Sequence, residues 1–373
     1  MSDPAHLATQ VAWWSFGLAF VFGAVANRTH FCTMGAVSDA VNIGDWGRMR
    51  MWLLAIATAI IGASALHYGG LIDLSKSYFH RPNLTWASHI IGGFLFGIGM
   101  TLGSGCGSKS LIRLGGGNLK SLVVLVFLGV SAYMTLKGLF APWRRGYLDS
   151  IAFDFTTRGI GGQDLPTLLS AAVGIDPRSG LLVAAAVVSS VLLIIVFKDR
   201  DFRHNGEQIF GGLVVGLIVV AGWYVTGHIG YGENPETLET VFFGTNSKAA
   251  ESFSFVAPVA YTLELLMLWT DKSLTVTFGV AAVLGMVAGS TAYALWSATF
   301  RWEGFVSIAD TRNHIIGGVL MGFGGVTALG CTIGQGISGF STLALGSIIT
   351  FFAIIAGAAL TMKYQYWRLM QET

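Results

Sequence analysis

Charged residues are scarce in this sequence. Asp, Glu, Lys and Arg together make up 11% of its 373 residues, whereas an average soluble domain contains roughly 25%. So few charges cannot cover the surface of a water-soluble protein of this length. The formal net charge of +2 is also too small to indicate nucleic-acid binding. The scarcity of charge therefore excludes the common soluble classes.

Cysteine is equally scarce. Cys32, Cys106 and Cys331 are the only three, they lie far apart, and no Cys-X-X-Cys pair occurs. Such residues cannot form a disulfide framework and do not match a zinc-binding pattern. We expect neither a metal ion nor another cofactor, so each cysteine has to be explained by its own sequence context.

Long apolar runs are abundant instead. Apolar residues make up 53% of the chain, and the mean hydropathy is +0.64. Several runs approach the roughly 20 residues that a helix needs to cross a bilayer. The runs are 11–26, 51–68, 90–104, 119–139, 181–197, 209–226, 254–269, 275–298, 315–329 and 343–362. The start of the chain lacks a basic region and a cleavage site of small residues, so the first run is expected to be a retained span. We predict an all-α integral membrane protein with about nine or ten membrane segments.

One apolar segment occurs twice. The sequence HIIGGFLFGIGMTLGSGC at 89–106 returns as HIIGGVLMGFGGVTALGC at 314–331, with ten of eighteen positions identical and a constant offset of 225. Each copy is rich in glycine and ends on a cysteine. Paired glycine-interrupted segments are typical of transporters built from internal repeats, with the substrate site near the midplane. We predict two pseudosymmetric repeats related by a pseudo-two-fold rotation, whose broken or re-entrant helices either enter the membrane from opposite sides or face one another.

The repeats divide the chain into three parts. We predict a first transport repeat at 11–140, a middle region with two spans and polar loops at 141–253, and a second transport repeat at 254–373. All three belong to a single integral-membrane domain. A loose alignment of 22–25 with 284–287, at an offset of 262, places Cys32 opposite Ala294. By that alignment the third thiol has no counterpart.

The distribution of basic residues favours one orientation. Lysine and arginine gather in the loop after the first span, at 198–204 and at the C-terminus, whereas the loop at 230–251 is acidic. By the positive-inside rule, this pattern predicts an external N-terminus and a cytoplasmic C-terminus. The Arg144-Arg145 pair fits that topology poorly.

The glycine density around both repeated cysteines predicts broken helices. The candidate binding residues there are Gly105, Gly107, Gly330, Thr332, Gly334 and Gln335. Each glycine inside a helix costs up to about 1 kcal/mol relative to alanine. A break in a helix leaves backbone N–H groups without their partners in the helix. Within the bilayer such groups must face other parts of the protein or a water-filled cavity. They also attract anions. Close packing of helices through small residues is the alternative interpretation.

All three cysteines lie in polar or glycine-rich contexts. A neutral thiol is a weak donor and a polarizable acceptor, which suits a sulfur or selenium atom. It does not need to ionise at bilayer depth, where a thiolate would be costly. We expect the three sulfurs to lie along one path, with at least two of the three pairs too far apart for a disulfide. Packing as small apolar side chains is the alternative.

Three charged residues near or within the apolar runs need a role. Lys109, three residues after Cys106, is either part of a functional site or a side chain that extends to the headgroups. Arg28 is a candidate element of an anion vestibule, or else an interfacial residue. Glu264 is the one carboxylate well inside an expected span, and Lys272 and Arg301 are candidate partners for it.

Three motifs in the chain resemble the YeeE/YedE sulfur-transport family. They lie at 27–35, 97–106 and 322–336, and each contains one cysteine. The resemblance implies a multi-pass protein of the bacterial inner membrane, with two pseudosymmetric halves and thiosulfate as the best-known substrate. It also implies that Cys32, Cys106 and Cys331 relay the ion through the pore. Some members are tied to selenium metabolism, and small sulfur-carrier proteins of the TusA type accompany others.

The preferred hypothesis is therefore a transporter, not an enzyme, with a small sulfur anion and membrane lipid as its partners. A transporter of another sulfur or selenium species, such as sulfide, sulfite or selenite, fits the same thiols. A membrane thiol oxidoreductase is a further alternative. Such an enzyme normally needs two thiols within disulfide range and an exposed nucleophile of low pKa. A structural subunit whose cysteines only pack is the last alternative.

Overall fold

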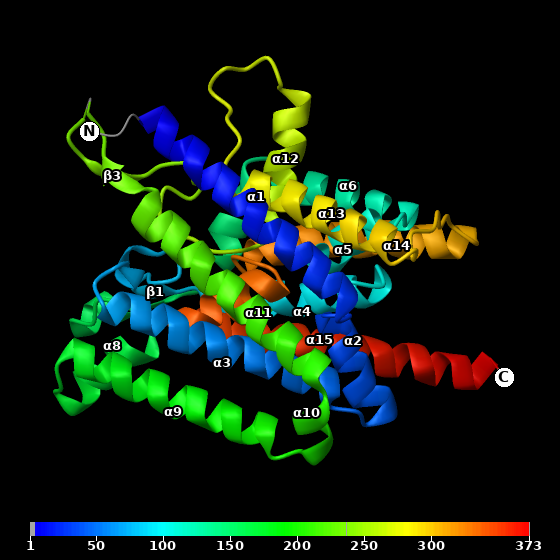
Figure 1. Ribbon diagram of the computed structural model, residues 1–373, viewed down its shortest axis with the longest axis horizontal. Coiled ribbons are helices and arrows are strands. Elements are labelled where there is room, and N and C mark those ends of the chain that lie inside the picture. Colours follow the sequence, from blue (N-terminus) through cyan, green and yellow to red (C-terminus); the bar gives the residue numbers. More distant parts are fainter. Residues whose placement is uncertain (1–3, 236, 373) are drawn as a thin grey trace.

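The computed structural model describes residues 4–235 and 237–372, and helices dominate it (Figure 1). The α-helices are α1 (Pro4–Arg28), α2 (Thr33–Ser38), α3 (Gly47–Tyr68), α4 (Trp86–Leu102), α5 (Gly107–Gly115), α6 (Leu119–Leu136), α7 (Ala141–Trp143), α8 (Leu165–Val173), α9 (Pro177–Phe197), α10 (Arg200–His204), α11 (Gly206–Tyr224), α12 (Ala257–Met267), α13 (Phe278–Trp296), α14 (Ile308–Thr327) and α15 (Leu345–Glu372). The π-helical turns are Asp39–Ile43, Arg144–Leu148, Val225–Ile229 and Gly334–Gly339, and the 3₁₀ turns are Leu74–Lys76, Phe155–Arg158 and Phe340–Thr342.

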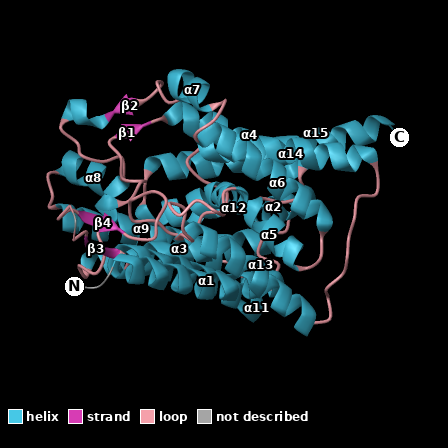
Figure 2. Cartoon of the chain, turned by 90° about the horizontal axis from the view of Figure 1, so that it is seen from above, coloured by secondary structure: helices cyan, strands magenta, loops and turns pink. Residues whose placement is uncertain are grey.

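Strands are few and short. They are β1 (Asn83–Leu84), β2 (Phe153–Asp154), β3 (Tyr231–Glu233) and β4 (Thr240–Phe242). They form two antiparallel pairs, β1 with β2 and β3 with β4. Figure 2 shows both pairs at the end of the molecule that holds the N-terminus. We call this the N end, and the opposite end, where α15 finishes, the C end.

The fold confirms the prediction of an all-α, multi-pass membrane protein. In the described part of the chain, eight helical segments are long and apolar enough to cross a membrane. The remaining two predicted runs correspond to α12 and α14. Helix α12 has only 11 residues, which is too short for a full span. Helix α14 has 20 residues but carries Asp310 and Arg312 in its first turns.

Polar caps and prolines set where several helices begin. Asp176 accepts a hydrogen bond from the backbone N–H of Arg178, and Pro177 occupies the first position of α9. Ser307 caps α14 in the same way, through the backbone N–H of Asp310. These residues satisfy N–H groups that a helix start leaves unpaired, and proline has no N–H to satisfy.

The repeated segments form two helices, α4 and α14, that cross in opposite directions at glycine contacts. A Cβ atom on Gly92 would lie 2.6 Å from the backbone N of Ala328 and 2.8 Å from the O of Gly324. A Cβ atom on Gly317 would lie 2.6 Å from the N of Gly103 and 2.7 Å from the O of Gly99. These two sets of contacts are related by the sequence offset of 225. The contacts show a pseudo-two-fold relationship between the repeats.

The last helix of each repeat, α6 or α15, obeys the same symmetry. Gly97 on α4 faces the backbone of α15, where an added Cβ atom would meet Ile354 O and, at 2.8 Å, Ala358 N. Gly322 on α14 faces α6 in the same manner, through Leu128 O and, at 2.8 Å, Ala132 N. Each repeat therefore packs its last helix on the partner repeat, and the two halves are interlocked.

The loose alignment of 22–25 with 284–287 is wrong. Helices α1 and α13, which that alignment equates, lie side by side and run in the same direction, since Gly285 contacts Phe16 and Gly289 contacts Phe20. Helices α11 and α3 form an equivalent parallel pair, through Gly212 and Gly216. The pseudo-symmetry therefore relates α11 to α1, and it relates α13 to α3. The counterpart of the chain around Cys32 is therefore the segment leading into α12, not Ala294.

Candidate functional site

The three cysteines share one backbone geometry at three helix breaks. Two residues before each cysteine, the backbone is left-handed, with φ of 52° at His30, 57° at Ser104 and 59° at Leu329. The next residue then donates its N–H to a carbonyl five residues earlier, as in Phe31 to Ala26, Gly105 to Met100 and Gly330 to Gly325. Each helix thus ends in the same cap, and a new helical turn begins at or just after the cysteine.

Cys331 has the densest set of polar neighbours. Its sulfur accepts backbone N–H groups from Phe255 at 3.3 Å and from Gly334 at 3.4 Å. The Ser254 hydroxyl lies 3.9 Å from the same sulfur. Because the lone pairs of the sulfur accept from the backbone, its S–H is the group left to donate. Cys331 is fully buried.

Cys106 and Cys32 lie at the other two breaks and are also buried. The Cys106 sulfur lies 3.2 Å from the Ser108 hydroxyl. The Cys32 sulfur caps α2 by accepting the N–H of Gly35 at 3.3 Å. All three cysteines are free thiols.

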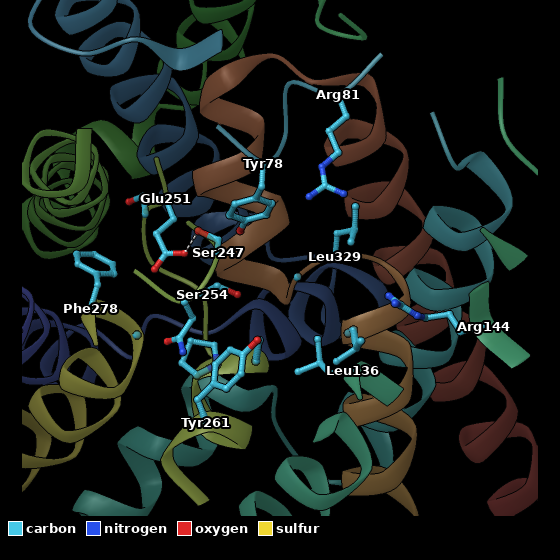
Figure 3. Close-up of a pocket in the computed structure, with 18 residues that line it drawn as sticks. Tyr78, Arg81, Leu136, Arg144, Ser247, Glu251, Ser254, Tyr261, Phe278 and Leu329 are labelled. Carbon is cyan, nitrogen blue, oxygen red and sulfur yellow. Dashed lines mark hydrogen bonds between the residues drawn. The ribbon is translucent and has the colours of Figure 1, made fainter. Parts of the chain in front are cut away.

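A cavity of roughly 230 Å³ opens beside Cys331, and we call it the Tyr78 cavity. Ser254, whose hydroxyl lies near the Cys331 sulfur, and Leu329 and Gly330, which precede Cys331 in the chain, form part of its wall. Polar residues from distant parts of the chain also line it: Tyr78, Arg81, Arg144, Asn246, Ser247, Glu251 and Tyr261. Apolar residues, among them Leu136, Phe278 and Val326, complete the wall. Figure 3 shows both arginine side chains extending into it from one side, with Glu251 on the other. Burial raises the pKa of Tyr78 well above its usual range, so the phenol is a neutral hydrogen-bond donor.

Two adjoining hollows of roughly 310 and 450 Å³ lie toward the C end, and we call them together the Lys109 cavity. Both contain Arg28, His30 and Lys109. Further cations in their walls are Arg48, Arg113 and Arg301. Glu207 and Glu303 are the acidic residues there, and Arg28 pairs with Glu207 at 3.5 Å. The excess of cations makes this cavity suited to anions.

The predicted residues around Cys331 gather closely. The N–H of Gly334 donates to the sulfur, and Gly330 lines the Tyr78 cavity. The side-chain amide of Gln335 donates to the carbonyl of Ala328 at 2.6 Å, which closes the end of α14. The hydroxyl of Thr332 is buried and has no hydrogen-bond partner among the described residues. It is therefore free to donate to an anion.

Of the predicted residues around Cys106, Lys109 lines the Lys109 cavity, whereas Gly105 and Gly107 lie at the helix break. Gly107 begins α5 and lies against Phe255, whereas Gly105 packs against the aliphatic part of Lys109. Lys109 is half-buried and lines the cavity together with Arg28 and His30. Arg28 itself is exposed, so it lies at the rim of the Lys109 cavity.

Sequence reasoning missed most of the Tyr78 cavity. Its tyrosines and arginines lie on loops and helix ends that are far apart in the sequence, and no motif joins them. The Ser254–Phe255 backbone beside Cys331 also carries no sequence signal, because an N–H group is present at almost every residue. Among these tyrosines and arginines, only Arg144 was noted from the sequence, because its positive charge fits the predicted membrane orientation poorly.

The partner of Glu264 is neither Lys272 nor Arg301. The hydroxyl of Tyr133 donates to its carboxylate at 2.6 Å, and the Lys137 ammonium lies 3.4 Å away. These groups come from α6, which packs on α12. They satisfy the charge locally, so Glu264 has a structural role.

Inverted, glycine-broken helices with buried polar groups at the breaks define a class of protein, the multi-pass membrane transporters built from internal repeats. Comparison with known proteins is more specific. Residues 28–360 match the model of the sulphur transport family, and the chain belongs to that family.

Two relatives carry a name that describes their transport activity. The thiosulfate transporter TsuA of Spirochaeta thermophila is 24% identical over 348 residues, which cover 92% of this chain and 96% of the relative. The thiosulfate transporter TsuA of Escherichia coli is 25% identical over 340 residues, which cover 85% of this chain and 84% of the relative. The similarity therefore extends over nearly the whole length of each protein.

Proposed function

We propose that this protein is a transporter of a small sulfur-containing anion in the bacterial inner membrane, and that thiosulfate is the substrate it takes up. The observation that carries the proposal is that three buried thiols share one backbone geometry at three helix breaks. The two relatives named thiosulfate transporters support the choice of substrate.

The anion first binds in the Tyr78 cavity. Arg81 and Arg144 supply positive charge there, and the tyrosine hydroxyls supply neutral donors. The sulfane sulfur of thiosulfate is large and polarizable, so a thiol S–H suits it better than a harder donor does. At Cys331, the thiol donates to the anion while Phe255 and Gly334 hold the sulfur in place.

The anion then passes from Cys331 to Cys106 and on to Cys32, and it leaves through the Lys109 cavity. Each step exchanges one weak S–H hydrogen bond for another, and no covalent bond forms or breaks. Weak, repeated sites favour conduction because the ion is held at each one without being trapped. The cations around Lys109 draw the anion toward the C end.

The repeats provide the scaffold for this path. We assign the transport repeats to 11–140 and 254–373, with α11 of the middle region 141–253 completing the second repeat as the counterpart of α1. The C end, rich in lysine and arginine, faces the cytoplasm by the positive-inside rule. A small sulfur-carrier protein of the TusA type would receive the anion at that end.

Uptake by cells tests the proposal. The chain is expressed in a sulfur-auxotrophic bacterium and supplied with labelled thiosulfate, sulfite, sulfate or selenite, with an empty vector as control. We expect uptake of thiosulfate well above the control and above the other three anions. Selective uptake of sulfite or selenite would replace thiosulfate as the substrate, and uptake of none would contradict the proposal.

A further inference from the structure

A carboxylate lies inside the cavity that is proposed to admit an anion. Glu251 lines the Tyr78 cavity, opposite Arg81 and Arg144 (Figure 3). Its backbone is fixed by two hydrogen bonds with the Thr226 hydroxyl, one from the hydroxyl to the Glu251 carbonyl at 2.5 Å and one from the Glu251 N–H at 3.2 Å. The position of the carboxylate is thus built into the fold, close to the loop that contacts Cys331.

The carboxylate has a neutral partner and not a cation. The Ser247 hydroxyl donates to it, and among the described residues no lysine, arginine or histidine forms an ion pair with it. Arg144 pairs instead with Asp149, at 3.7 Å. A charged Glu251 would therefore repel a dianion that enters the same small cavity and would weaken the attraction that Arg81 and Arg144 exert from the opposite side.

The other ionisable groups around the cavity keep one charge state near neutral pH. Tyr78 and Tyr261 are neutral, because burial raises the pKa of both phenols. Arg81 and Arg144 remain cationic, as arginine does throughout the physiological range. Burial raises the pKa of Glu251 to about 7, while the hydrogen bonds from Ser247 and Asn246 act in the opposite direction. Glu251 is thus the group lining this cavity whose charge changes near neutrality.

We propose that Glu251 is a proton-binding site and that the Tyr78 cavity binds a proton together with the anion. This inference rests on the proposed function. Protonation removes the negative charge that opposes the anion, and a bound anion in turn favours the protonated carboxyl. The two ligands therefore bind with positive linkage. Thiosulfate itself stays a dianion over this range, so the proton belongs to the protein.

The sign of the pH dependence follows from this linkage. Below the pKa of the free protein, Glu251 is already protonated and the Kd for thiosulfate is independent of pH. Above it, each bound anion takes up close to one proton, and the Kd rises about tenfold per pH unit. A fixed negative charge or a purely structural carboxyl would give no such slope.

The experiment is calorimetry with thiosulfate on the purified full chain in detergent, between about pH 5.5 and 8.5. Each titration is repeated in two buffers of different ionisation enthalpy, so that proton uptake is measured directly. We expect a flat Kd at the acid end and the tenfold rise at the alkaline end for the native protein. Glu251→Gln keeps the size and a hydrogen-bonding group, so it should bind with a flat Kd and no proton uptake.

Two further variants make the result decisive. Glu264→Gln removes a buried carboxylate outside the cavity and should keep the native slope. Ser247→Ala removes a donor that stabilises the charged carboxylate, so it should move the onset of the slope to higher pH. It also serves as the test if Glu251→Gln does not fold.

The outcomes separate the two proposals. A pH-independent Kd for the native protein, or an unchanged slope in Glu251→Gln, would overturn the proton site and leave the transport function standing. An unchanged onset in Ser247→Ala would also count against the proton site. No thiosulfate binding by the native protein at any pH would contradict the proposed function itself.

Discussion

Ser104 and Leu329 adopt the same left-handed backbone conformation, 225 residues apart and two residues before a cysteine. Their side chains share no chemistry, so the backbone of the break is what the repeat preserves. His30 adopts this conformation too, ahead of Cys32. Such a conformation costs about 1–2 kcal/mol for a residue with a side chain, and strain of this kind concentrates at functional sites.

This relationship gives a first prediction. Ser104→Val should lower the stability of the protein by about 1–2 kcal/mol, because a β-branched residue tolerates the left-handed region poorly. Ser104→Gly should be neutral or slightly stabilising, because glycine enters this region without strain. Thermal unfolding of both variants in the same detergent provides the measurement. Equal stability of the two variants would argue against strain at the break.

A second prediction concerns the crossing of α4 and α14. Gly92→Ala should destabilise the protein by about 1–3 kcal/mol, because the added methyl group meets the backbone of the partner helix, which cannot give way easily. Gly317→Ala, its symmetry equivalent, should have a similar effect.

Gly17→Ala is the matched control, since no atom lies within 4 Å of the position a Cβ would occupy there. It should leave stability unchanged or raise it slightly, since alanine favours helix more than glycine does. If the three variants melted at the same temperature, the close contact of α4 with α14 at Gly92 and Gly317 would be contradicted.

A third prediction tests the role of Lys109. Lys109→Gln should reduce thiosulfate uptake several-fold, mainly through a higher KM, because a half-buried cation on the proposed path of the anion would contribute to binding. Lys109→Arg should keep most of the uptake, since the charge remains. Labelled uptake over a range of thiosulfate concentrations separates KM from the maximal rate.

Lys198→Gln removes an exposed cation near the same end of the molecule and is the control. Equal uptake by Lys109→Gln and Lys198→Gln would assign Lys109 to the headgroup region, as a side chain that only extends to the lipid surface.

The sequence alone predicted the repeat that α4 and α14 share, because contact with backbone atoms requires glycine where the two helices cross. Gly92 and Gly317 cannot be replaced without moving a helix, so the two copies stay alike. The pairing of α1 with α13 has no comparable repeated segment in the sequence. Its symmetry equivalent, α11 with α3, uses glycines on different helices, and the alignment of 22–25 with 284–287 equated the wrong elements.

The candidate site, like the fold, could be predicted only where its residues recur in the sequence. The thiols and the glycines around Cys106 and Cys331 were found because they recur in the sequence. The Tyr78 cavity was not, because Arg81, Arg144 and Glu251 come from separate loops that only the folded chain brings together. Lys137 as the partner of Glu264 was missed for the same reason.

The central claim is that the thiols themselves carry the anion. The most direct measurement is uptake of labelled thiosulfate by the Cys106→Ser, Cys331→Ser double variant and by each single variant, at matched amounts of folded protein in the membrane. Serine keeps the size and the hydrogen-bond donor but lacks the polarizable sulfur. We expect each single variant to lose most of its uptake and the double variant to lose nearly all, with a smaller or direction-dependent loss in Cys32→Ser. Native uptake by the double variant would show that backbone N–H groups and cations suffice, and would contradict the relay.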